Sequence, residues 1–155
     1  MTGLSVEGFK TCRHEAAHAV LCFLLWGRGY LDLVARAVPR CEGPLRGVTM
    51  SHPPTDRPNE QVLFEQIVST LGAVRVEPIG GDGDMRKAWS AARALNPDDP
   101  QSVIDAATKR ADELIATREF GRGLSALEGA LMSRLSIYGH EADTIIKTAI
   151  EKAAV

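Results

Sequence analysis

The spacing of apolar residues predicts two long helices in the first half of the chain. Residues 9–26 contain neither proline nor glycine and end in an apolar run, so we expect a helix that begins near Ser5 and stops at the glycines of 27–29. A second long helix is expected from Asn59 onward, because apolar residues recur at helical intervals, at Val62, Ile67, Leu71 and Val74.

Two short segments between these helices favour β-strands. YLDLVARAV (30–38) and LRGVTMS (45–51) are rich in β-favouring residues, and the loop-forming sequence PRCEGP lies between them. A proline-rich loop (52–58) follows the second segment. We therefore expect a small β-sheet near residues 30–52.

The second half of the chain predicts further helices separated by breaks. A turn at GGDG (80–83) precedes a helix over 84–95, which ends at NPDDP. From Ser102 to Val155 the chain is rich in helix-forming residues, and FGRG (120–123) and YGH (138–140) divide it into about three helices. The pattern as a whole predicts an α+β fold that is predominantly α-helical.

Composition places few limits on what the protein binds. A chain of 155 residues is expected to form one domain, residues 1–155, and to bury roughly 70% of its unfolded surface. The formal net charge of -2 gives no bulk attraction to nucleic acid or to an anionic membrane, so we expect no nucleic-acid partner. The longest apolar run, Ala19 to Trp26, is too short for a membrane span, which needs about 20 residues.

The cysteines and the N-terminus indicate a compartment. Cys12, Cys22 and Cys41 are an odd number without CxxC spacing, which argues against a disulfide framework or a zinc ribbon. The N-terminus lacks a basic segment followed by a signal-peptide core. We therefore expect a complete cytoplasmic protein without a membrane span.

The sequence HEAAH (14–18) lies in the first predicted helix and has the HExxH pattern of zinc hydrolases. Residues four apart in a helix differ by about 40° around the axis and about 6 Å along it, so His14 and His18 share one face and can bind one ion. Glu15 lies one residue round from that face, where it can reach a water on the metal. Such a water has a pKa near 7, and a carboxylate can take its proton as it attacks a peptide carbonyl.

The motif alone can arise by chance in roughly one chain in a hundred of this size. The residues around the motif favour a metal site over purely structural histidines. The run AVLCFLLW directly after the motif indicates a buried helix, and two histidines in such a helix need polar partners. A metal ion would supply that partner.

A catalytic zinc usually has three protein ligands, and the sequence alone leaves the third one open. The third histidine of the HExxHxxGxxH pattern is excluded by the residues that follow the motif. His52 lies in a proline-rich loop without rigid support, and Cys22 lies in an apolar run, where cysteine is usually a core residue. Glu77 would complete a two-histidine, one-glutamate site, and Asp82 or Asp84 a two-histidine, one-aspartate site.

Five segments, in this order, resemble the peptidase domain of the FtsH-type ATP-dependent zinc proteases. RHEAAHAV is similar to the family's HEAGHA segment, and AVPRCEGPLRGVTMSHP to its Ile-Pro-Arg … Gly-Tyr-Thr segment. STLGAVRVEPI resembles its Leu-Gly-Gly-Arg-Ala-Ala-Glu segment, and GGDGDMRKAWSAAR its Gly-Ala-x-x-Asp-Leu segment. LMSRLSIYGHEADTII resembles the family's pair of helices joined at a Gly-Glu-Glu-Ile turn. The likeness covers roughly residues 10 to 152.

The resemblance implies a particular site. The aspartate of the family's Asp-Leu segment is its third zinc ligand, and it falls on Asp84, which would join His14 and His18, with Glu15 as the catalytic base. The resemblance also implies that the edge of the second strand holds an extended substrate by main-chain hydrogen bonds, at Gly47, Val48, Thr49 and Met50. The expected function is zinc-dependent endopeptidase activity on unfolded or flexible polypeptides.

The chain also departs from the FtsH-type pattern. It has no Walker-type GxxxxGK[ST] sequence and no membrane anchor, so the resemblance suggests a separate ATPase as partner, and a homo-oligomer like the family's. Ala17 replaces the family's glycine within the motif, which a helix tolerates. Two alternatives remain: a catalytically silent module that binds a partner protein, and another zinc hydrolase with Glu77 as third ligand.

Overall fold

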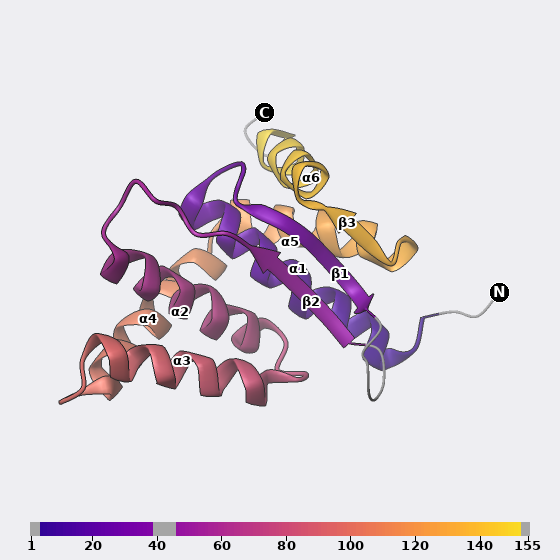
Figure 1. Ribbon diagram of the computed structural model, residues 1–155. Helices are drawn as coiled ribbons and strands as arrows, with labels where there is room; N and C mark the ends of the chain where they lie inside the picture. Colours follow the sequence, from indigo (N-terminus) through magenta and orange to yellow (C-terminus); the bar gives the residue numbers. More distant parts are fainter. Residues whose placement is uncertain (1–3, 39–45, 153–155) are drawn as a thin grey trace.

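The computed structural model of the chain describes residues 4–38 and 46–152, and six helices and three strands lie in this part of the chain (Figure 1). The fold is predominantly helical with a small antiparallel sheet, which confirms the predicted fold class. In chain order the elements are α1 (Val6–Trp26), β1 (Leu31–Val38), β2 (Arg46–Ser51), α2 (Asn59–Val76), α3 (Gly81–Leu95), α4 (Pro100–Ile115), α5 (Arg118–Ser133), β3 (Ser136–Tyr138) and α6 (Gly139–Lys152).

Helix α1 is the centre of the hydrophobic core. The Ser5 hydroxyl caps its first turn by accepting from the Gly8 amide, and Gly27, with a φ of 84°, ends it. The helix packs against β1 and β2 on one side and against α2 and α5 on the other. Val20 and Leu21 are fully buried, and burial of such a side chain contributes about 1.5–3 kcal/mol.

The sheet has the strand order β2-β1-β3, and both pairings are antiparallel. Val34 at its centre pairs with Thr49 of β2 and with Ile137 of β3. Strand β2 is therefore an edge strand. The predicted β1 and β2 segments are confirmed. Strand β3 was not predicted: the helix expected to continue to the break at 138–140 ends at Ser133, and Ser136–Tyr138 form a strand. Three residues are too few to show a pattern, and they form a strand only by pairing with β1.

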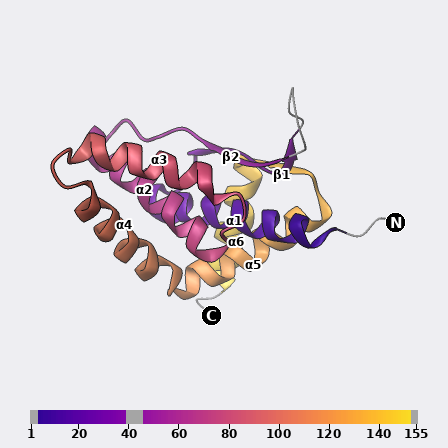
Figure 2. The same cartoon turned by 90° about the horizontal axis from the view of Figure 1, so that it is seen from below.

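Helix α2 packs on α1, and α3 and α4 pack in turn on α2 (Figures 1 and 2). Helix α2 lies between α1 and the other two helices, and α3 also contacts α4. The N-terminal end of α3 differs from the prediction. Of the four residues of GGDG, only Gly80 has a left-handed φ, of 66°, and the helix begins at Gly81 instead of Asp84.

The break predicted at 120–123 is also wrong. Helix α4 ends at Ile115, and Thr117 caps α5 with its hydroxyl, so the FGRG sequence lies inside α5. The second glycine of this sequence serves packing: a Cβ atom on Gly123 would lie 3.1 Å from Cγ1 of Val20, and α1 and α5 approach closely there.

One cluster of buried apolar side chains extends through all six helices and through β1 and β3. Where β3 joins α6, Gly139 is so close to β1 that a Cβ atom would lie 1.6 Å from the Leu31 carbonyl oxygen. Among the described residues, none of the helices combines the length and apolar character needed to cross a membrane.

Candidate metal centre

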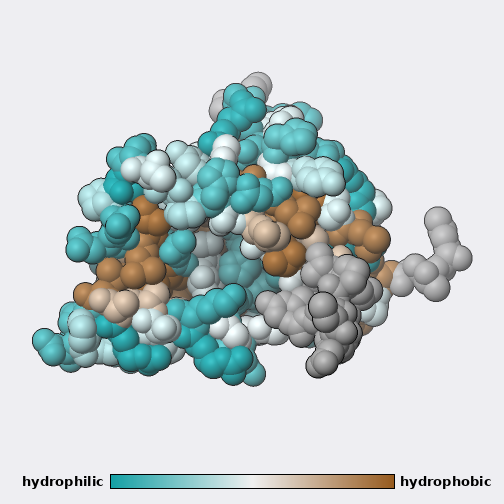
Figure 3. Space-filling view, viewed as in Figure 1, coloured by the Kyte–Doolittle hydropathy of each residue, from teal (hydrophilic) through white to brown (hydrophobic). Residues whose placement is uncertain are grey.

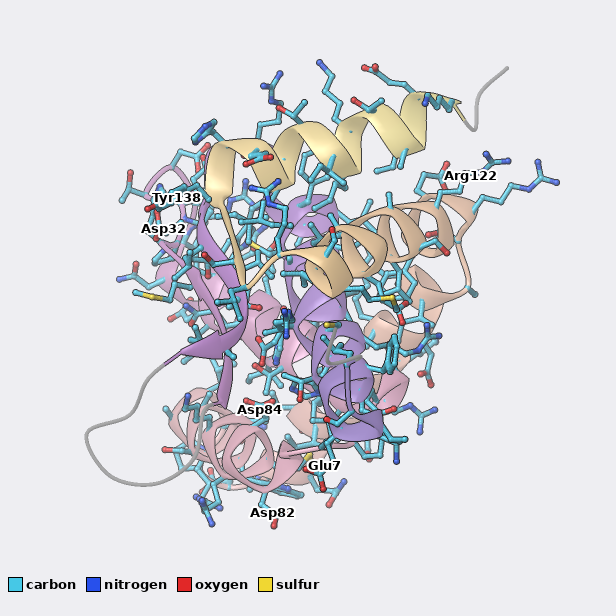
Figure 4. All side chains as sticks on the ribbon, turned by 90° about the vertical axis from the view of Figure 1, so that its right-hand side faces the viewer. Glu7, Asp32, Asp82, Asp84, Arg122 and Tyr138 are labelled. Atoms are coloured by element: carbon cyan, nitrogen blue, oxygen red, sulfur yellow. The ribbon has the colours of Figure 1, made fainter. Side chains whose placement is uncertain are left out.

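Three side chains from two distant segments meet at one point: His14 and His18 of α1 and Asp84 of α3. The Oδ2 atom of Asp84 lies 2.9 Å from Nε2 of His14 and 3.1 Å from Nε2 of His18, and the two Nε2 atoms are 3.2 Å apart. Figure 4 shows Asp84 on the side of α3 that faces α1. The three residues form a group that could hold a metal ion.

The hydrogen bond between His14 and Glu77 fixes the proton on the ring of His14, the first candidate ligand. Nδ1 of His14 lies 2.6 Å from the carbonyl oxygen of Glu77, which can only accept, so Nδ1 carries a hydrogen. In the neutral ring, Nε2 then has a lone pair that points at the carboxylate of Asp84. Two acceptors at 2.9 Å need a cation between them, and either a second proton or a metal ion supplies it. The donor set therefore fits a metal.

In the metal-free cluster, the pKa values of His14 and Asp84 shift in opposite directions. Burial opposes the charged form of His14, but hydrogen bonds to Asp84 and to the Glu77 carbonyl, with the charges of Glu15 and Asp84, raise its pKa above the usual value. Burial would also raise the pKa of Asp84, but the hydrogen bonds from His14 and His18 and their charges hold it well below its usual range. In the absence of metal, protons therefore hold the cluster together.

Glu15 lies beside the cluster without joining it. Its side chain is buried, with 8% of the residue exposed, and its Oε2 atom accepts a hydrogen bond of 2.6 Å from the hydroxyl of Thr49 on β2. The same hydroxyl lies 3.0 Å from the backbone oxygen of Glu15. A carboxylate in this place can act on a group bound next to the metal ligands.

Two members of the cluster, His18 and Asp84, line one groove of about 420 Å³ together with Glu15. Figure 3 shows this face of the molecule hollowed between β2 and α3, with α1 beneath. Glu15, His18 and Asp84 lie on its polar side. Apolar side chains continue the groove away from the cluster, namely Leu25, Trp26, Leu63 and Ile67.

The residues predicted on β2 lie beside the site. Gly47, Val48 and Thr49 line the groove, whereas Met50 is 52% exposed and does not line it. This edge strand borders the groove, and its role in holding a substrate stays a prediction. The contact that sequence reasoning missed is the side chain of Thr49, since only its main chain was considered.

The structure does not bring the other ligand candidates to the cluster. The Glu77 carboxylate accepts from the amide of Ile79, so this residue meets His14 only through its carbonyl. Asp82 is exposed and lies on the far side of α3 from Asp84 (Figure 4). His52 pairs with Asp32 at 2.8 Å, in an exposed position.

The cysteines are not ligands in the described cluster. Cys22 belongs to the hydrophobic core, where burial, with the charge of Asp143, raises the pKa of its thiol to about 12. Cys12 is also a buried free thiol. Cys41 lies outside the described residues. Thiols held in the protonated form are poor metal ligands, which leaves the ligand role to the histidines and Asp84.

The chain was compared with models of known protein families and with curated proteins, and neither comparison gave a match. The site is therefore interpreted from its own geometry: two imidazoles and a carboxylate on two helices, with a second carboxylate and an edge strand beside them.

Proposed function

We propose that this protein is a zinc-dependent endopeptidase with a site plan like that of the FtsH-type peptidase domain. The observation that carries the proposal is the meeting of His14, His18 and Asp84 beside a groove that is lined by His18, Asp84 and Glu15. Structural histidines would need only hydrogen-bond partners. They would not need a second carboxylate placed beside them and open to the same groove.

The size of the cluster supports zinc. Tetrahedral zinc with bonds of about 2.0–2.1 Å would place its ligand atoms about 3.3 Å apart. The three ligand atoms here are separated by 2.9, 3.1 and 3.2 Å, so small side-chain movements would seat the ion. Two imidazole nitrogens and one carboxylate oxygen suit zinc, and they leave one coordination position for water or substrate.

The proposed mechanism divides the work among the side chains. Zinc, when bound, would polarise the peptide carbonyl and lower the pKa of a water. Glu15 takes the proton of the attacking water on its carboxylate and returns it to the nitrogen of the leaving amine. The Glu77 carbonyl holds the ring of His14 in the tautomer that presents Nε2 to the metal.

Strand β2 suggests the substrate class. As the edge of the sheet beside the groove, it can pair with one extended polypeptide by main-chain hydrogen bonds, which select weakly among side chains. A folded protein cannot present such a segment, and the sequence has no Walker motif to drive unfolding. We propose flexible polypeptides as substrates, with a separate ATPase as partner for folded ones. A cytoplasmic location and a homo-oligomer remain predictions.

The test is cleavage of an unstructured fluorogenic peptide by the zinc-loaded protein. Turnover should fall at least about a hundredfold in Glu15→Gln, as for loss of a general base, and should stop with a chelator. Glu7→Gln, an exposed glutamate on the same helix, is the matched control and should cleave like wild type. Equal turnover in wild type and Glu15→Gln would refute the mechanism. Bound zinc with no turnover at all would instead support the silent, partner-binding module.

A further inference from the structure

One face of β2 packs along the side of α1 that faces the groove. Gly47 and Thr49 are two positions apart and so point to the same side of the sheet. A Cβ atom on Gly47 would lie 2.8 Å from Cγ of Glu15 and 2.5 Å from Cγ2 of Thr11, which shows how closely the strand approaches the helix. Thr49 reaches Glu15 itself.

These contacts act on the two oxygens of the Glu15 carboxylate differently. Oε2 receives the Thr49 hydroxyl at 2.6 Å, a distance typical of a hydroxyl group bonded to a charged oxygen. Among the described residues, none donates a hydrogen bond to Oε1. Because Oε1 is not among the buried side-chain atoms that lack a partner, it is at least partly exposed. It is therefore the oxygen left accessible from the groove that Glu15 lines.

Thr49 is well suited to hold a side chain in place. Its branched Cβ limits rotation about χ1, and its backbone is held in the ladder opposite Val34. Gly47 makes room for this arrangement, because a Cβ atom there would lie 2.8 Å from Cγ and 3.1 Å from Oε1 of Glu15.

We propose that Thr49 is a positioning residue, whose hydroxyl holds Oε2 of Glu15 so that Oε1 faces the substrate. This inference rests on the proposed peptidase function. It gives β2 two roles, because the strand expected to receive the substrate backbone also orients the base. A single rigid strand would then set the position of Glu15 relative to the bound peptide.

The kinetic test compares Thr49→Val with Thr49→Ser. The valine variant keeps the shape and loses the hydroxyl, so kcat should fall about tenfold to a hundredfold, as for a misplaced catalytic group, while KM changes little. The serine variant restores the hydroxyl and should recover kcat to within about threefold of wild type. Unchanged kcat in Thr49→Val, or no recovery in Thr49→Ser, would overturn the proposal.

A second measurement works on the metal-free protein and does not depend on turnover. The Thr49 hydroxyl has two acceptors on Glu15, the carboxylate and the backbone oxygen, and only the first is lost in Glu15→Ala. Thr49→Val should therefore reduce the folding equilibrium constant about tenfold more in the wild-type background than in the Glu15→Ala background. Thr144→Val, which removes an exposed hydroxyl bonded to a backbone oxygen, is the control and should have the same effect in both backgrounds.

The two measurements separate this inference from the proposed function. If wild type cleaves no peptide, the peptidase proposal fails, and the mutant cycle still decides whether Thr49 holds the Glu15 carboxylate. If wild type cleaves and the cycle shows no coupling, the peptidase proposal stands and the role of Thr49 is refuted.

Discussion

Asp84 and His18 are 66 positions apart in the chain, yet Oδ2 of Asp84 lies 3.1 Å from Nε2 of His18. The contact joins α3 to α1 across the groove, although α3 packs mainly on α2 and α4. The position of Asp84, the candidate third ligand, therefore depends on how α2 places α3, and the cluster forms only when these helices are assembled.

Asp84→Ala should abolish tight zinc binding, and Glu77→Ala should not. We expect the aspartate variant to bind zinc at least about a hundredfold more weakly, because a directly bound ligand matters at least as much as the outer contacts that cost 10–100-fold. Glu77→Ala keeps the carbonyl that contacts His14. Competition with a chromophoric chelator measures both affinities. Tight binding by Asp84→Ala would contradict the assignment and reopen Glu77.

The metal-free protein should lose stability as the pH rises above about 6.5. The folded-state pKa of His14 is raised, so its contribution is fully present below its unfolded pKa of about 6.5 and is lost as pH rises through the folded value. The loss should not exceed about 1.4 kcal/mol per pH unit. Urea unfolding of chelated protein between pH 5 and 8 tests this. His140→Asn, at an exposed histidine, should keep the slope, whereas His14→Asn should remove it.

Asp84 adds a loss of stability on the acid side. Its folded-state pKa is lowered, so its contribution is present above its unfolded pKa of about 3.9 and is lost as pH falls through the folded value. Unfolding of the metal-free protein below pH 4 should be less steep in Asp84→Asn than in wild type. Identical acid unfolding of the two proteins would show that the carboxylate is not held by the histidines.

Zinc affinity should increase with pH over the range in which His14 loses its proton. Metal replaces the proton between His14 and Asp84, so binding releases protons and is weaker in acid. Isothermal titration in buffers of different ionisation enthalpy counts the protons released per zinc. Binding without proton release near pH 6 would mean that the ion binds elsewhere.

Gly139→Ala should destabilise the fold far more than Gly129→Ala. The new methyl group at residue 139 would collide with the Leu31 backbone, which cannot rotate away, and we expect a loss above about 3 kcal/mol. Gly129 lies in α5 with no atom near a new Cβ, so alanine there should stabilise by roughly 0.5–1 kcal/mol. Thermal unfolding compares the variants, and similar midpoints would contradict the close packing of β3–α6 on β1.

Local patterns predicted the long elements because their causes are local. Helix α2 begins at Asn59 as expected, after a proline-rich loop, and α1 ends at Gly27. Strand β3 was missed because it exists through pairing with β1, about a hundred positions away. The break after Ile115 was missed because its signal is a single capping threonine, while Gly123 of the 120–123 segment serves close packing inside a helix.

The candidate site likewise has one part that follows from local sequence and one part that depends on contacts between distant segments. Helical spacing alone pairs His14 with His18, but Glu77, Asp82 and Asp84 were equal candidates in spacing, and only the family resemblance favoured Asp84. The structure separates them by helix geometry, since Asp82 and Asp84 lie on different sides of α3. The Thr49 hydroxyl could not be predicted, because it depends on the register between β2 and α1.

The burial of α1 bears on how this protein could change over time. Most of what fixes the helix is apolar contact on the sides away from the groove, through residues such as Ala16, Val20 and Leu21. A lineage could therefore lose Glu15 or a metal ligand and keep the helix, the groove and the strand edge beside it. Under the proposed function, such a descendant would keep the strand edge that receives an extended peptide, and the same scaffold could pass from cutting polypeptides to carrying them.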